Sequence, residues 1–124
     1  MSCTWTSLRR SCNVEVKASA RFLRLSPRKA RLVTDLITGK SAEEAIAILE
    51  NLSSSTALPL GRVVRSAIAN AENNFNLTLE TLYIKRAIAN EGPRMKRAWF
   101  RGRGRRDTKL HRLAHLEVVL DSKE

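Results

Sequence analysis

Residues 94–112, RMKRAWFRGRGRRDTKLHR, hold nine Lys and Arg side chains and a single acid, Asp107, around Gly102 and Gly104. Cations packed this densely repel one another and have no stable place in a protein core, so they predict an anionic partner. Nucleic-acid phosphate fits this requirement, because each neutralised phosphate releases condensed counterions and thereby favours binding. Glycines between the arginines allow a partner to approach the backbone closely. The segment therefore predicts a nucleic-acid interface.

The predicted contacts in this segment are cations that neutralise phosphate, with arginine able to donate two hydrogen bonds at once. They are Arg94, Lys96, Arg97, Arg101, Arg103, Arg105, Arg106, Lys109 and Arg112. Trp99 and Phe100 lie among them, and their rings suit stacking on unpaired bases, which favours RNA bound without sequence specificity. The alternative is that the two rings brace the segment's own strands, and both roles are compatible.

A second basic cluster lies where a helix is predicted to begin. Ser26 suits the cap position and Pro27 the first helical position. Arg28, Lys29 and Arg31 follow directly, although the positive end of the helix dipole disfavours cations there. A phosphate bound at the helix N-terminus would resolve this conflict, and a solvated basic turn is the alternative. We expect Ser26, Arg28, Lys29 and Arg31 to contact RNA.

Catalytic or metal chemistry is poorly supported. His111 and His115 are four residues apart in a predicted strand, which separates them by about 13 Å, too far to chelate one metal. Cys3 and Cys12 have no CxxC partner and predict reduced thiols. The GRGRR motif at residues 102–106 lacks the strand and helix that flank a dinucleotide-binding fingerprint. We expect neither an enzyme nor a bound cofactor or metal.

Composition agrees with nucleic-acid binding. The chain has 124 residues, which predicts one domain, and a formal net charge of +11 from 23 Lys and Arg against 12 Asp and Glu. No apolar run approaches the ~18 residues of a membrane span, and no basic segment carries a strongly apolar helix face. We expect no membrane association and no stable homo-oligomer. Residues 1–13 read as a flexible extension ahead of a single domain at residues 14–124.

Hydrophobic spacing predicts the elements that position these clusters. Residues 14–22 alternate as a half-buried strand with Lys17 and Arg21 on a basic outer face, where we expect further RNA contacts. Three helices follow: one from Ser26 to Gly39, one opened by a Ser41-Ala42-Glu43-Glu44 capping box, and one over residues 57–74. The predicted apolar stripe of the first is Leu32, Val33, Leu36 and Ile37, and that of the third is Leu60, Val63, Val64, Ala67, Ile68 and Ala71.

Two further strands, at residues 81–91 and 116–120, flank the basic segment. A reversal near Arg103 would pair them as an antiparallel hairpin, with Ile88 opposite Val118 and Arg86 opposite Leu120. Residues 92–112 would then project as two arms of about 33 Å. A two-stranded ribbon this cationic is expected to be flexible alone and ordered by RNA.

A DNA-binding helix-turn-helix is the other architecture that the short Gly39-Lys40-Ser41 turn allows. Its second helix would have to face phosphates. That helix instead carries Glu43, Glu44 and Glu50 and has no Arg or Lys. Non-specific RNA binding by the basic ribbon agrees better with the charge distribution.

Several motifs occur in the order found in bacterial large-subunit ribosomal protein twenty-two, which the chain resembles from about residue 16 to residue 120. The most specific are Ser26-Pro27-Arg28-Lys29, residues 67–74, and Glu91-Gly92-Pro93 followed by Lys96-Arg97. The resemblance implies an α+β fold in which three helices pack on a small antiparallel three-stranded sheet with a long basic β-hairpin extension. It also implies a structural role in the large ribosomal subunit, where the protein binds rRNA and assists assembly.

The family resemblance further implies that the hairpin lines the nascent-peptide exit tunnel. The implied lining residues are Met95, Lys96, Arg97, Trp99, Phe100, Arg101, Gly102, Arg103, Gly104 and Arg105. The implied partners are large-subunit rRNA, neighbouring ribosomal proteins and the nascent peptide, and the implied location is the ribosome of the cytoplasm or of an organelle. A free-standing RNA-binding module that needs no ribosome is the alternative function.

Overall fold

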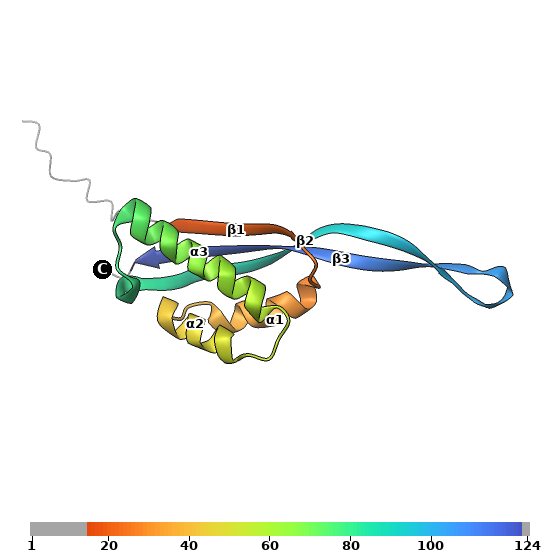
Figure 1. Cartoon of the computed structure of the whole chain (residues 1–124), viewed down its shortest axis with the longest axis horizontal. Coiled ribbons are helices and arrows are strands. Elements are labelled where there is room, and N and C mark those ends of the chain that lie inside the picture. The colour runs from red at the N-terminus through yellow and green to blue at the C-terminus, as the bar shows by residue number, and fades with distance from the viewer. Residues whose placement is uncertain (1–14, 123–124) are drawn as a thin grey trace, which may run out of the picture.

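The computed structural model describes residues 15–122. Figure 1 shows the helices packed against a sheet, from which a long hairpin projects. The elements are β1 (Val16–Leu23), α1 (Pro27–Ile37), α2 (Ala42–Asn51), α3 (Ala57–Phe75), a 3₁₀ turn (Leu79–Thr81), β2 (Leu82–Phe100), a second 3₁₀ turn (Gly102–Gly104) and β3 (Arg106–Ser122). The predicted α+β architecture is confirmed. The predicted extension at residues 1–13 lies outside the described residues. No helix between residues 15 and 122 is long and apolar enough to cross a membrane.

The sheet has three antiparallel strands in the order β1-β3-β2, so the last strand of the chain lies in the centre. The helix α3 packs over β1 and β3, and α1 packs over β2 (Figure 1). The largest fully buried side chains between these layers include Ile37, Leu60, Ile84, Leu116 and Leu120. Among residues 15–122, no helix covers the opposite face of the sheet.

The third helix agrees with its sequence pattern. All six residues of the predicted stripe of α3 are buried. The helix ends at Asn76, which takes a left-handed conformation (φ 52°) that Asn tolerates better than most residues. In α2, the Ser41 side chain accepts a hydrogen bond from the Glu44 backbone N–H at 3.3 Å, as the capping box predicts.

The predicted stripe of α1 is confirmed at Val33 and Ile37 but wrong at Leu32 and Leu36. The buried residues of α1 are Pro27, Ala30, Val33, Thr34 and Ile37, while Leu32 is 70% and Leu36 is 50% exposed. Ser26 does occupy the cap position, but its side chain makes no capping hydrogen bond. The helix rotates toward its small residues because these let it lie close to β2, and the larger leucines are left on the outside.

The alternation predicted for the first strand fails at Phe22. Val16 and Ala18 face the helices as predicted, but a bulge shifts the register between Ala20 and Leu23. Phe22 lies in this bulge with φ 57° and is 63% exposed instead of facing the core. The predicted start of the strand at Val14 lies outside the described residues.

The hairpin is confirmed, but its predicted register is wrong by one residue at Ile88. Ile88 lies opposite Glu117, and Arg86 lies opposite Val119. A bulge between Ile84 and Arg86 inserts one residue into β2. The slip moves the side chains that follow to the other face, as far as a second bulge between Glu91 and Arg94. Ala89 therefore faces the core and is buried, whereas Ile88 is only half-buried.

Lys85, the residue in this bulge, connects the sheet to two acids. Its Nζ lies 3.0 Å from Asp121 Oδ2 and 2.6 Å from Glu15 Oε1. The hydrogen bond to Glu15, followed by that to Asp121, raises the pKa of Lys85, and Lys85 in turn lowers the pKa of Glu15. Asp121 is 1% exposed, so the ammonium group compensates a buried carboxylate.

The phase of α1 yields a direct test. We expect Ile37→Ala to lower the free energy of unfolding by about 2–5 kcal/mol, because the substitution leaves a cavity under a fully buried side chain. The matched variant Leu36→Ala removes a half-exposed side chain and should change it by less than about 0.5 kcal/mol. Urea unfolding monitored by circular dichroism gives both values. Equal losses for the two variants would contradict the observed packing.

Candidate RNA interface

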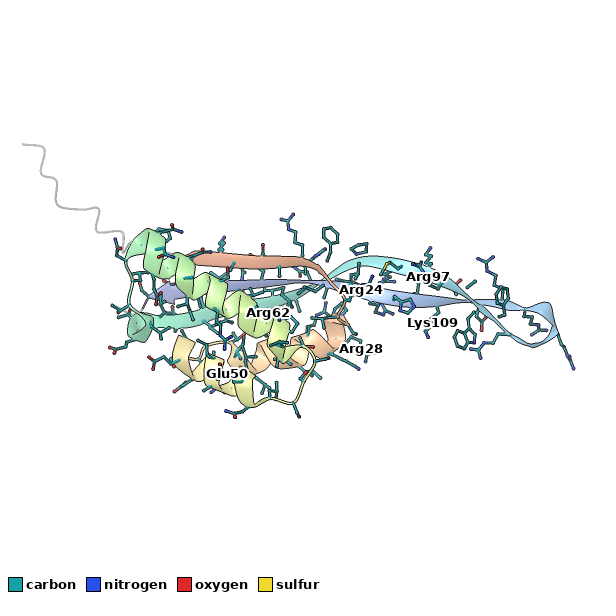
Figure 2. All side chains as sticks on the ribbon, viewed as in Figure 1. Arg24, Arg28, Glu50, Arg62, Arg97 and Lys109 are labelled. Carbon is teal, nitrogen blue, oxygen red and sulfur yellow. The ribbon has the colours of Figure 1, made fainter. Side chains whose placement is uncertain are left out.

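Beyond the globular domain, β2 and β3 continue as a two-stranded ribbon formed by residues 94–112, and Figure 2 shows its side chains in solvent on both sides. The ladder pairs Arg94 with Arg112, Arg97 with Lys109, and Phe100 with Arg106. Paired residues share a face, and successive residues alternate between faces. Cations therefore occur on both faces, so the ribbon can contact phosphates on either side.

The two predicted stacking rings point to opposite faces. Trp99 pairs with Asp107 and its neighbour Phe100 pairs with Arg106, so the rings do not brace each other. The Lys109 ammonium lies 4.8 Å from the centre of the Trp99 ring, in a cation–π contact. Phe100 is 80% exposed. Each face of the ribbon thus presents one aromatic ring among cations, an arrangement suited to stacking with unpaired bases.

The tip reverses at the predicted residue. Arg103 and Gly104 both have positive φ (58° and 71°), a conformation that glycine adopts without strain and arginine does not. The turn is closed by the Arg101 N–H, which donates to the Arg105 carbonyl at 2.8 Å. The Arg101 side chain also bonds Asp107 at 2.7 Å. These contacts hold the backbone of the tip and leave the Arg103 and Arg105 side chains exposed.

An acid at the base of the ribbon neutralises two of its arginines. Arg94 donates two hydrogen bonds to the Glu91 carboxylate, at 2.8 and 2.9 Å, and Arg112 donates a third at 2.9 Å. These bonds lower the pKa of Glu91, the Arg94 hydrogen bond most, and Glu91 raises the pKa of Arg94. Beside this cluster, a Cβ on Gly92 would lie 3.2 Å from the Leu113 carbonyl oxygen and 3.1 Å from His115 Nε2, so glycine permits the close packing of the bulge there.

The start of α1 adjoins the base of the ribbon. One hollow is lined by residues of both, namely Arg24, Leu25, Ser26, Met95, Arg97, Leu110, His111, Arg112 and Leu113. Arg28 and Lys29 are exposed on the first turn of α1, and Figure 2 places Arg24 and Arg28 at the junction between the domain and the ribbon. The two basic clusters of the sequence thus form one continuous cationic surface.

The structure does not bring every predicted contact to this surface. Arg31 turns toward the sheet, where its Nε donates to the Ala89 carbonyl at 3.3 Å. Lys17 and Arg21 lie in a separate hollow with Phe22 and His115. Arg24 and His111 line the hollow at the base of the ribbon but were not among the predicted RNA contacts, although Arg24 stands only two residues before the predicted cap. Within residues 15–122, no three His, Cys, Asp or Glu residues form a group that could hold a metal ion.

Fold and charge together define a class, a small α+β domain that carries a long and strongly cationic β-hairpin. The family described as "Ribosomal protein L22p/L17e" matches residues 18–121. The chain is 50% identical over 107 residues to a protein named large ribosomal subunit protein uL22 from Thermotoga sp. (strain RQ2), covering 86% of this chain and 67% of the relative. Relatives of the same name from Pseudothermotoga lettingae (50% over 112 residues, 90% and 81% covered) and Clostridioides difficile strain 630 (46% over 111 residues, 90% and 100% covered) agree. The chain belongs to this ribosomal protein family.

The hydrogen bonds of Glu91 predict that substituting Arg94 changes the pKa of Glu91 more than substituting Arg112 does. A lowered folded-state pKa means that the Glu91 carboxylate stabilises the fold above its ordinary pKa of about 4.3 and that this stabilisation is lost as the pH falls through the lowered value. We expect Arg94→Ala to raise the pKa of Glu91 toward the ordinary value, and Arg112→Ala to raise it less. Carbon-13 NMR titration of the carboxyl group measures both. A shift of the same size in Arg97→Ala, whose Nη1 bonds the Lys96 carbonyl instead, would contradict the assignment.

Proposed function

We propose that the ribbon and the start of α1 bind rRNA within the large ribosomal subunit and assist its assembly. As a member of the family, the chain is a structural constituent of that subunit and not an enzyme, and its partners are rRNA and neighbouring ribosomal proteins. The proposal adds which surface makes the RNA contact.

The observation that carries the proposal is the unbalanced charge of the ribbon. Its nine Lys and Arg face one acid within the segment, and Glu91 neutralises part of the charge at its base. Arg103, Arg105, Arg106 and Lys109 lie on the exposed distal half and form no ion pair within residues 15–122. Such cations gain most by replacing condensed counterions on RNA phosphates.

We further propose that the distal ribbon lines the nascent-peptide exit tunnel, as the family resemblance implies. The support is geometric. Residues 94–112 are paired in a narrow two-stranded ladder, whose tip lies far from the helices in Figure 1. A ribbon of this kind can pass between rRNA segments while the helices remain at the subunit surface. We expect the ribosome to be the protein's location in the cell and the isolated chain to be monomeric.

The ribbon's role as phosphate contact is tested by a pair of double variants. Arg103→Ala with Arg105→Ala should weaken binding to large-subunit rRNA and make the slope of log affinity against log salt shallower by about 1.5 units, because two phosphate contacts are lost. Filter binding over a range of salt concentrations measures the slope. The matched control, Lys40→Ala with Arg62→Ala, removes two exposed cations outside the candidate interface. An unchanged slope in the ribbon variant, or an equal change in both, would refute the assignment.

Assembly into the ribosome is tested separately by sedimentation of the tagged, full-length chain from native lysate. We expect it to migrate with the large subunit in moderate and high salt, and to leave that fraction after ribonuclease treatment, because its anchoring contacts are to rRNA. Migration at the top of the gradient before digestion would instead support the free-standing RNA-binding module.

A further inference from the structure

The hollow that contains Lys17 and Arg21 is separate from the ribbon and from the start of α1. Its remaining lining comes from Ala18, Ser19, Phe22, Asn90, His115 and Glu117, drawn from all three strands. Lys17 and Ser19 alternate with the core residues Val16 and Ala18, which places the hollow on the face away from the helices.

Phe22 is held in the hollow in a costly conformation. A positive φ is rare for a bulky residue, and its persistence requires support from the surrounding structure. The support comes from His115, whose Nδ1 accepts a hydrogen bond from the Phe22 N–H at 3.0 Å. The two rings also meet edge to face, with centres 4.9 Å apart. The result is an aromatic ring that is fixed in orientation and yet mostly exposed, which is the requirement for a stacking platform.

Polar groups beside this ring lack partners within the described chain. The Asn90 and Glu117 side chains line the same hollow, and neither forms a hydrogen bond or ion pair with a residue between 15 and 122. Asn90 lies directly opposite His115, and Glu117 lies opposite Ser19. An ionised Glu only accepts hydrogen bonds, through two oxygens, whereas the Asn amide both donates and accepts.

Two cations complete the set. Lys17 and Arg21 line the hollow from β1, are exposed, and form no ion pair with a described residue. The hollow therefore offers a ring for stacking, a carboxylate that accepts from paired N–H donors, and positive charge for an anion. A single nucleotide has all three complementary features in its base plane, its base edge and its phosphate.

We propose that this hollow binds one unpaired guanine nucleotide of the RNA, with the base stacked on Phe22 and its phosphate near Lys17 and Arg21. Guanine is the base selected because its Watson–Crick edge presents two adjacent N–H donors to the Glu117 carboxylate. Adenine, cytosine and uracil each place an acceptor beside their donor on that edge. The inference rests on the proposed RNA-binding function and names a second, base-selective contact beside the non-specific ribbon.

The test is NMR titration of the full-length protein with guanosine 5′-monophosphate. Separate titrations with adenosine, cytidine and uridine monophosphates provide the comparison. We expect saturable shifts of the Phe22 and His115 ring signals and an affinity for the guanine nucleotide several-fold above the others. Phe22→Asn keeps a residue that tolerates positive φ but removes the ring, and should weaken binding roughly fivefold or more. Glu117→Gln should abolish the preference for guanine.

Phe75→Asn is the control, since Phe75 is a half-exposed ring at the end of α3, outside the hollow, and this variant should bind like the unsubstituted chain. Absence of ring shifts, or equal shifts with all four nucleotides, would overturn the inference. Filter binding to large-subunit rRNA separates this result from the proposed function. If the unsubstituted chain binds large-subunit rRNA but shows no guanine-selective shifts of its ring signals, only the guanine site fails. If the unsubstituted chain does not bind rRNA, the proposed function fails.

Discussion

The pairing of β2 with β3 is the interaction on which the rest of this molecule depends. One ladder begins beside the buried core at Leu82 and Ser122 and runs without a change of partner to Phe100 and Arg106 at the tip. A two-stranded ribbon in water is marginal by itself. Here the inner halves of β3 and β2 form the centre and one edge of a sheet that packs against the helices. Hydrophobic burial therefore fixes the inner halves of both strands, and the exposed ribbon continues from them.

Electrostatics divides the ribbon along its length. At the base, Glu91 compensates Arg94 and Arg112, and near the tip Asp107 binds Arg101. Glu91 lies at the bulge at the base of the ribbon, and Asp107 lies beside the turn at its tip. Together they hold these two irregular points of the backbone without cancelling the net positive charge of the ribbon. The acidic residues of α2 lie on the globular part instead. The molecule therefore presents its positive potential where the chain projects, which steers an anionic polymer to the ribbon and the start of α1.

Bulges explain the two errors in the strand predictions, and one of them also forms the proposed nucleotide site. The alternation predicted for residues 14–22 failed at Phe22, and the predicted pairing of Ile88 with Val118 also failed. Each failure lies beside a bulge, at Ala20–Leu23 and at Ile84–Arg86. An inserted residue reverses the side-chain alternation, and hydrophobicity alone does not reveal where the insertion falls. At Phe22 the consequence is an exposed ring held by His115, a contact between residues 93 positions apart that no local pattern contains.

The sequence by itself determined the number and order of the elements, the reversal at Arg103, the buried stripe of α3 and the concentration of cations in residues 94–112. These follow from local spacing, turn chemistry and charge, which act over a few residues. Only the tertiary structure decided the phase of α1, the register of the hairpin, the separation of Lys17 and Arg21 from the ribbon, and the recruitment of Arg24 to it. Each of these depends on which surfaces fit together after folding. Close packing favoured Ala30 over Leu32 against β2, although hydrophobicity alone favours the leucine.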